Sequence, residues 1–353
     1  MIVTDVDYEV YQWPRTVPIR NGLHTYQTSG LTVVKIRTDE GVTGIGLGRD
    51  IRDSPEVGIA ILNHFKQHVI GEDPFDTEKI WRKMWEPKLV GRRGITTRVI
   101  SGIDLALWDI KGKVANRSVH KLLGGYADKV PVYVAGGYYE EGKGLEELAV
   151  EVEDSLSMGA KAVKMKVGGA PINEDVERVR VVRETVGSGI KVMIDANCAY
   201  RYYEAIELAH KIEKYDIAWF EEPVTADDKK GLSEVRSFTD IPIATGENEA
   251  TRFSFRDLAE LRAADIFQPD LAICGGITEG SRIAAIASAY QIRLAPHLWG
   301  GALMFAAGLH LCAASPAAFI IEYSLGANPM LFELSPEAPV CICLLYTSPS
   351  PRD

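Results

Sequence analysis

From residue 130 onward, short apolar runs alternate with helical patterns along the chain. The eight runs have the length and composition of buried strands, and they cover residues 130–136, 162–167, 191–197, 218–223, 242–247, 265–270, 293–297 and 319–323. Strands that alternate with helices build a parallel sheet, and eight such units are what a (β/α)8 barrel requires. A doubly wound open sheet is the competing fold, but no GxGxxG motif follows an early strand. We therefore predict an α/β protein with a (β/α)8 barrel.

The first 125 residues or so follow another order, with strands first and helices after them. Strands are predicted over 2–13, 31–38 and 42–47, and helices over 56–70, 76–85 and 97–115. This order indicates an α+β domain. The polar segment between the first two strands, residues 20–30, is predicted to be a mobile loop. The expected domains are an α+β domain over residues 1–125 and the barrel over residues 126–335.

Charge and composition exclude several classes of protein. The formal net charge of −10 argues against a protein that holds nucleic acid by its phosphates. Acidic residues near the start argue against an export signal, and the most apolar stretch, residues 302–321, contains Gly308, His310 and Pro316, which favours a buried helix and strand over a membrane span. The five cysteines show no CxxC spacing, so we expect a reduced, cytoplasmic protein that acts on neither membranes nor nucleic acid.

Polar or charged side chains stand at the ends of seven of the predicted strands. Counted from the first, they recur at intervals of 29, 26, 26, 23, 27 and 25 residues, at Lys166, Asp195, Glu221, Glu247, Asp270, His297 and Glu322. In a barrel the C-terminal strand ends meet at one mouth, where the active site lies. One acid after a strand is usually a helix cap or a loop residue. The whole set indicates a site.

Three of these residues have the chemistry of a metal site. Asp195, Glu221 and Glu247 follow adjacent strands, so their carboxylates can meet, and carboxylate oxygens suit Mg²⁺, with Mn²⁺ as a substitute. No histidine or cysteine stands among them, which argues against zinc. Glu222 points away by the period-two rule and is interpreted as structural. Asn197 shares a face with Asp195. Its side chain could contact the substrate or a metal-bound water, and an ordinary role in a turn is equally plausible.

The remaining groups can move protons. Lys164 and Lys166 both point inward because they are two residues apart, and a lysine beside a dication in a barrel mouth should have its charged form disfavoured, as a general base needs. Asp270 can fix the tautomer of His297 and make it a second base or acid, although a buried histidine without a catalytic role is the alternative. Glu322 could donate a proton to an oxyanion or orient neighbouring groups.

These residues resemble the enolase superfamily, specifically its mandelate racemase-like branch. The resemblance spans about residues 1–335 and includes the SGIDLALWDIKGK segment at residues 101–113. It implies Mg²⁺ at the three carboxylates and bases at Lys166 and at the Asp270–His297 pair. It also implies that the N-terminal domain caps the barrel, that its loops 20–30, with His24, and 48–55 select the substrate, and that the protein is a homo-oligomer.

Most members with this set of bases resemble dehydratases of sugar acids, which gives a small anionic substrate and a 2-keto-3-deoxy product. Lactone cycloisomerases and racemases or epimerases of the same branch use the same groups, and they rank second and third. A catalytically inactive sugar-acid binding protein is the alternative from another class. Loss of a metal ligand would have favoured it, and none is missing.

The end of the chain departs from the family pattern. After Ser335 and Pro336 the family continues with a segment that closes the barrel, whereas residues 336–353 form an atypical tail. Its last ten residues resemble a translated adapter rather than native sequence. The expectation is a truncated reading frame whose tail packs poorly.

Overall fold

The computed structural model describes residues 1–48, 54–86, 94–299, 301–324 and 345–347. They form two sheets, one antiparallel and one mainly parallel. Residues 48–55 were predicted to hold a substrate-selecting loop, and positions 49–53 of that segment lie outside the described residues.

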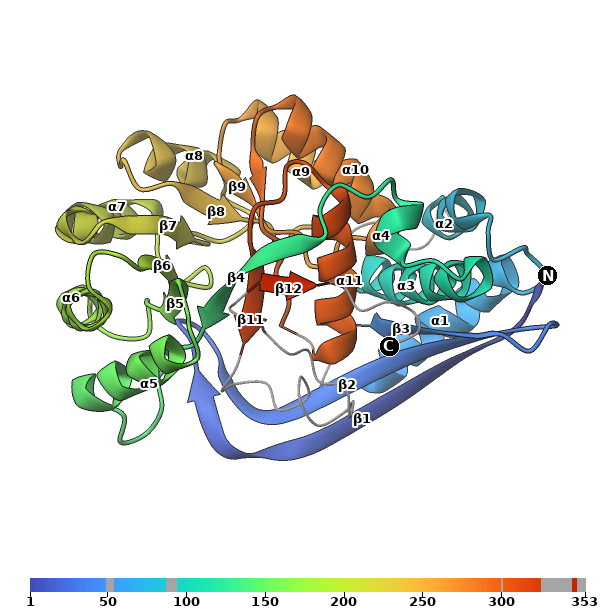
Figure 1. The fold of residues 1–353 in the computed structure, drawn as a ribbon, viewed down its shortest axis with the longest axis horizontal. Coiled ribbons are helices and arrows are strands. Elements are labelled where there is room, and N and C mark those ends of the chain that lie inside the picture. Colours follow the sequence, from blue (N-terminus) through green and yellow to red (C-terminus); the bar gives the residue numbers. More distant parts are fainter. Residues whose placement is uncertain (49–53, 87–93, 300, 325–344, 348–353) are drawn as a thin grey trace.

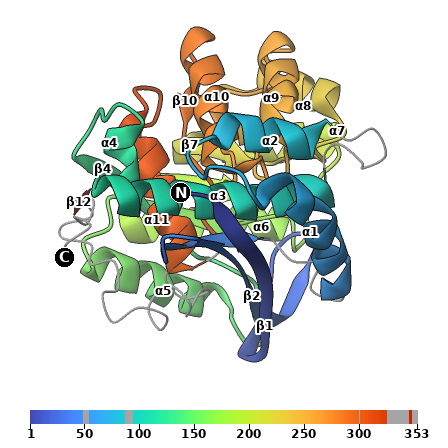
Figure 2. The ribbon, with the colours of Figure 1, turned by 90° about the vertical axis from the view of Figure 1, so that its right-hand side faces the viewer.

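The N-terminal part consists of a three-stranded antiparallel sheet and helices that pack against it. In chain order its elements are β1 (Val3–Arg20), β2 (Thr25–Thr38), β3 (Thr43–Gly48), α1 (Pro55–Val69), α2 (Thr77–Trp85), α3 (Ile95–Ala115) and α4 (Val119–Leu122). Figure 2 shows α1, α2 and α3 together on one side of the molecule. The predicted order of strands and then helices is the observed one.

The prediction of a loop over residues 20–30 is wrong for most of that segment. β1 and β2 pair from Val3 and Thr38 as far as Arg20 and Thr25, so only residues 21–24 form the turn. The segment is polar but rich in threonine and contains Tyr26, residues that favour strands. β1 is the edge strand, which lets it contain prolines without losing a ladder partner. The resulting hairpin is the long curved ribbon along the lower side of Figure 1.

The described residues from Lys129 to Ser324 form the predicted barrel. Its strands are β4 (Lys129–Ala135), β5 (Ala162–Lys166), β6 (Lys191–Asp195), β7 (Ile217–Glu221), β8 (Ile243–Thr245), β9 (Ile266–Phe267), β10 (Arg293–Leu294) and β11 (Ile321–Ser324). Its helices are α5 (Leu145–Ser157), α6 (Ile172–Val186), α7 (Tyr202–Ile212) with a 3-10 turn (Glu213–Tyr215), α8 (Lys229–Ser237), α9 (Thr251–Glu260), α10 (Gly276–Ala289) and α11 (Ala302–Ala314).

From β4 to β10, each strand pairs in parallel with the next one in chain order, and β11 pairs in parallel with β4. A parallel bridge between Leu294 and Ala318 links β10 to the segment before β11. Alternate side chains of a strand face opposite ways. Tyr133 belongs to one buried cluster, whereas Val132 and Val134 belong to the cluster that includes the outer helices. The same alternation places Met165 among the helix-facing residues, as predicted.

Contacts between α3 and the start of α10 join the N-terminal part to the barrel. The indole of Trp108 donates to Thr278 Oγ1 over 2.9 Å, and the Asp104 carboxylate accepts from the Thr278 amide over 2.9 Å. Burial raises the pKa of Asp104 to about 7. Gly276 has a φ of +82°, and a Cβ there would collide with Asp104, so this approach requires glycine. A side chain of one part thus caps a helix of the other.

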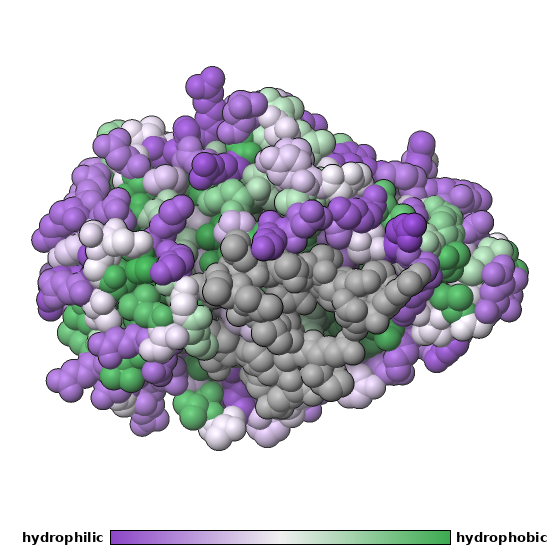
Figure 3. Space-filling model, in the orientation of Figure 1, coloured by the Kyte–Doolittle hydropathy of each residue, from purple (hydrophilic) through white to green (hydrophobic). Residues whose placement is uncertain are grey.

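On the face drawn in Figure 3, hydrophilic side chains predominate over the outer helices at the left, with apolar patches between them. No helix within the described ranges combines the length and the apolar character needed to cross a membrane. Residues Leu345–Thr347 form β12, which pairs with β4 antiparallel. The other positions of the predicted atypical tail lie outside the described residues.

We predict that Asp104→Ala lowers the free energy of unfolding by about 1–3 kcal/mol, because the buried Thr278 amide then lacks its acceptor. Asp104→Asn is the matched control. It keeps an oxygen acceptor, and we expect it to lose less than half as much. Urea unfolding of the three proteins measures both values. Equal losses in the two variants would contradict the assigned role of the acceptor.

Candidate active site

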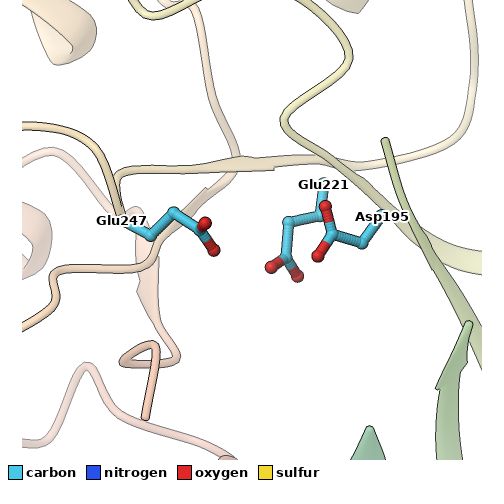
Figure 4. A group of neighbouring side chains, drawn as sticks. All are labelled: Asp195, Glu221 and Glu247. Atoms are coloured by element: carbon cyan, nitrogen blue, oxygen red, sulfur yellow. The ribbon is translucent and has the colours of Figure 1, made fainter. Parts of the chain in front are cut away.

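Three carboxylates meet at the C-terminal end of the barrel, as predicted. Asp195 ends β6, Glu221 ends β7, and Glu247 lies two residues beyond β8. One oxygen from each lies within 4.8 Å of the others, and Figure 4 shows the three side chains directed toward a common point. Asp195 and Glu221 are fully buried, whereas Glu247 is partly exposed to the cavity.

Hydrogen bonds from neighbouring side chains orient Glu221. Its Oε2 accepts from the indole of Trp219 over 3.0 Å and from Nε2 of Gln268 over 2.7 Å. Burial raises the pKa of Glu221 to about 7, and the nearby charge of Asp195 adds to the shift. Gathering three buried carboxylates therefore has an electrostatic cost that positive charge at this point would offset.

Two buried lysines supply part of that positive charge. Lys164 Nζ lies 2.6 Å from Glu221 Oε1, 3.2 Å from Glu322 Oε1 and 3.7 Å from Asp195 Oδ2. Lys166 pairs with Asp195. Burial raises the pKa of Asp195, but the two lysines lower it more, so the net pKa lies below its ordinary value. The prediction that both lysines point inward is confirmed by these contacts.

The predicted lysine pKa shift was for a lysine beside a dication, and without that cation the protein groups shift the pKa of both lysines upward. Burial lowers the pKa of Lys166, but the carboxylate of Asp195 raises it more, and the net pKa lies above the ordinary value. Lys164 behaves in the same way beside Glu221 and Glu322. The predicted shift took burial and a bound cation into account but not the attraction of the carboxylates, which stabilises the charged lysines.

His297 and Asp270 form the predicted pair. His297 Nδ1 lies 2.9 Å from Asp270 Oδ2, and its Nε2 lies 3.3 Å from Glu247 Oε2. Burial lowers the pKa of His297, but Glu247, Glu322 and Asp270 raise it more, to about 9. The imidazolium form is therefore favoured at neutral pH, which suits a proton donor.

Glu322 lies within β11 rather than at its end, and it contacts the same cluster from the other side. Its Oε2 accepts a hydrogen bond over 2.9 Å from the amide of Leu298, the residue that follows His297 in the chain. Burial raises the pKa of Glu322, but Lys164 and His297 lower it more, so the net pKa lies below its ordinary value. This ionised carboxylate fits the orienting role among the two alternatives and not the proton donor.

A cavity of about 430 Å³ connects these groups with the hairpin tip. Its wall includes Lys166, His297, Glu247 and Glu322 from the barrel and His24 from the turn between β1 and β2. Asn197 also lines it and donates to Glu247 Oε1 over 3.3 Å. Both residues expected to touch substrate therefore face the space in which a substrate would lie.

The sequence analysis missed several residues at the cavity. Tyr138 lies just beyond β4, the strand whose end was passed over in the search for polar groups, and Trp299 lies two residues after His297. Burial raises the pKa of Tyr138 to about 12. Tyr26 and Arg98 reach the wall from the N-terminal part. Position relative to the strand ends could have indicated Tyr138 and Trp299, whereas the last two needed the tertiary structure.

Glu222 does not belong to the group of three carboxylates, as predicted. It has a φ of +40°, in the left-handed region that few residues other than glycine adopt. Its carboxylate accepts from Asn248 Nδ2 over 2.9 and 3.0 Å and from the Cys198 thiol over 3.4 Å. Asn197 and Cys198 also have positive φ values, so the turns after β6 and β7 are both strained beside the cluster.

The donor set fits Mg²⁺. The three ligands would be the carboxylates of Asp195, Glu221 and Glu247, all hard oxygen donors. Burial and then the charge of Asp195 raise the pKa of Glu221, and a cation would offset both effects. The wall at Glu247 opens to the cavity, which leaves room for further oxygen ligands.

Comparison with known proteins agrees with this geometry. The chain is 38% identical over 301 residues to arabinonate dehydratase of Saccharolobus solfataricus, covering 85% of this chain and 80% of the relative. It is 32% identical over 340 residues to D-galactarolactone cycloisomerase of Agrobacterium fabrum, covering 93% and 89%. The crystal structure of a racemase from Streptomyces coelicolor A3(2) with bound magnesium superposes with a TM-score of 0.91 at 29% identity, covering 99% and 95%.

Two family models match most of the chain. Residues 4–124 match the N-terminal domain of mandelate racemase / muconate lactonizing enzyme, and residues 147–347 match the enolase C-terminal domain-like model. With the barrel, the antiparallel capping sheet and the three carboxylates, these matches place the chain in the mandelate racemase/muconate lactonizing enzyme family of the enolase superfamily.

Proposed function

We propose that this protein is a Mg²⁺-dependent sugar-acid dehydratase that forms a 2-keto-3-deoxy acid. The observation that carries the proposal is that Lys166 and His297, the latter paired with Asp270, line one cavity together with Glu247 of the proposed metal site. Similarity to arabinonate dehydratase supports the choice of reaction. The polar wall and the size of the cavity suit a small hydroxylated acid.

Held by Asp195, Glu221 and Glu247, Mg²⁺ would supply positive charge that stabilises the negative charge developing on the substrate as the α-proton leaves. The same charge would disfavour the protonated form of Lys166, as a general base requires. Lys166 accepts the α-proton. His297 donates its proton to the β-hydroxyl group, the carbon–oxygen bond breaks, and water departs. The resulting enol then tautomerises to the 2-keto acid. Asp270 holds the His297 ring through Nδ1, and Glu322 and Lys164 keep the charges around the cluster balanced.

A lactone cycloisomerase is the second candidate, because similarity to D-galactarolactone cycloisomerase extends over more of the chain. That reaction starts with the same proton abstraction but yields no free water. A screen of aldonic and aldaric acids and their lactones, read for 2-keto-3-deoxy product and for isomerised lactone, separates the two. Binding without any turnover across the screen would instead favour the inactive sugar-acid binding protein.

The metal assignment predicts that chelation abolishes turnover and that Mg²⁺ restores it, with Mn²⁺ as a substitute. Glu247→Gln should lower kcat/KM by more than the roughly 10- to 100-fold that loss of a group supporting a metal ligand costs, because it removes a ligand. Glu260→Gln, at an exposed position on α9, is the control and should retain activity. Full turnover in excess chelator would contradict the assignment.

The roles of the two proton-transfer groups predict different phenotypes in deuterated water. Lys166→Ala should abolish both turnover and exchange of the substrate α-proton, which NMR follows directly. His297→Asn should lower product formation by about 10²–10⁴-fold while exchange continues, because only the acid is lost. His64→Asn, on the exposed face of α1, is the matched control and should behave like the unmodified protein.

Two results would overturn these roles. Near-normal turnover in both Lys166→Ala and His297→Asn would mean that neither residue is catalytic. Exchange accompanied by inversion, with no keto product from any substrate, would favour a racemase over a dehydratase.

A further inference from the structure

The connection between β4 and α5 contacts the hairpin just before its tip. The main chains of Tyr139 and Arg20 exchange two hydrogen bonds of 2.9 Å each and form an antiparallel bridge. The Arg20 guanidinium carbon also lies 5.0 Å from the centre of the Tyr139 ring. Because Arg20 is the last residue of β1, these contacts hold the hairpin at the start of the turn 21–24.

On its other side, Tyr139 is bound to the barrel. Its hydroxyl group donates to Oδ1 of Asp175 and accepts from the Gly169 amide over 3.1 Å. Asp175 is fully buried, and it also accepts from the Gly168 amide over 2.8 Å and from the Tyr200 hydroxyl over 3.0 Å. A hydrogen bond to a buried carboxylate is among the stronger kinds, so the phenol is firmly fixed.

The turn itself is internally ordered. Asn21 Oδ1 accepts from the amides of Leu23 and His24 over 2.9 and 2.7 Å, and Asn21 Nδ2 donates to the Tyr26 hydroxyl over 3.1 Å. The Tyr26 ring centre lies 4.9 Å from that of Trp299. Gly22 lies against the barrel, where a Cβ would collide with the carbonyl oxygen of Ala196. The turn can therefore move as a unit, and its place depends on its anchors.

We propose that Tyr139 is a positioning residue for substrate binding, which links Arg20 to the buried carboxylate of Asp175 and so holds the turn at the wall of the cavity. Among the described residues, those that line the cavity include Asn21 and His24 but not Tyr139. Tyr139 therefore acts through the hairpin. Its effect should fall on substrate binding, because the proton-transfer groups come from the barrel strands.

The first test is kinetic and rests on the proposed function. Tyr139→Phe keeps the ring and the main-chain bridge but loses the bond to Asp175. We expect KM to rise about tenfold, the factor that corresponds to one hydrogen bond to a charged group, with kcat within about twofold. Tyr200→Phe is the matched control. It removes the other phenol from the same carboxylate without a described contact to the hairpin, and both constants should stay within about twofold.

The second test needs no substrate, so it stands even if the proposed function fails. Hydrogen–deuterium exchange of peptides covering residues 19–26 should rise about tenfold in Tyr139→Phe and stay unchanged in Tyr200→Phe, because only the first variant weakens the attachment of the residue that bridges to the hairpin. Arg20→Gln, at an exposed position of the hairpin, removes the guanidinium that contacts the Tyr139 ring. It should also raise the exchange of residues 19–26. It replaces Tyr139→Phe if that variant does not fold.

Unchanged exchange at residues 19–26 in the anchor variants would overturn the proposal. So would an equal rise in Tyr200→Phe, because the effect would then come from general loosening around Asp175. With an active enzyme, a fall in kcat without a change in KM would also overturn it. Absence of turnover in every protein, combined with the expected exchange pattern, would reject the proposed function and leave the positioning role intact.

Discussion

The arrangement at the barrel mouth depends on how three carboxylates can be held together away from water. Asp195 and Glu221 are fully buried, and repulsion between such groups opposes folding unless positive charge lies close by. Lys164 and Lys166 provide it from β5, the neighbouring strand, and His297 provides it opposite Glu247. Two of these cations, Lys166 and His297, are the proposed proton carriers. Lys166 and His297 therefore both balance the charge of the carboxylates and, in the proposal, move protons.

The N-terminal part forms one side of the cavity beside these groups, and buried polar contacts join it to the barrel. Asp104 on α3 accepts from the first turn of α10, and Trp108 donates to the same residue, Thr278. These buried polar contacts are directional, so they fix the relative placement of the two parts better than apolar packing alone. These contacts therefore also determine the position of the cavity wall that the N-terminal part contributes.

Much of this could be predicted from the sequence. Strand and helix periodicity indicated the barrel, and the interval between Lys166 and Glu322 indicated which side chains share its mouth. Three features needed the structure. The hairpin through residues 20–30 depends on pairing between β1 and β2, and the raised lysine pKa depends on summed charges at short range. The proposed role of Tyr139 depends on its contacts with Arg20 and with Asp175, which are far from each other in sequence.

The turn between β1 and β2 has a consequence for how such a chain can change over time. It comprises residues 21–24, at the far end of two strands that pair on both sides of an irregularity between Pro14 and Ile19. Lengthening a turn by a few residues costs little closure entropy. New sequences there would change the wall of the cavity while leaving Lys166 and His297 in place. Under the proposed function, selectivity and proton chemistry could then be inherited separately.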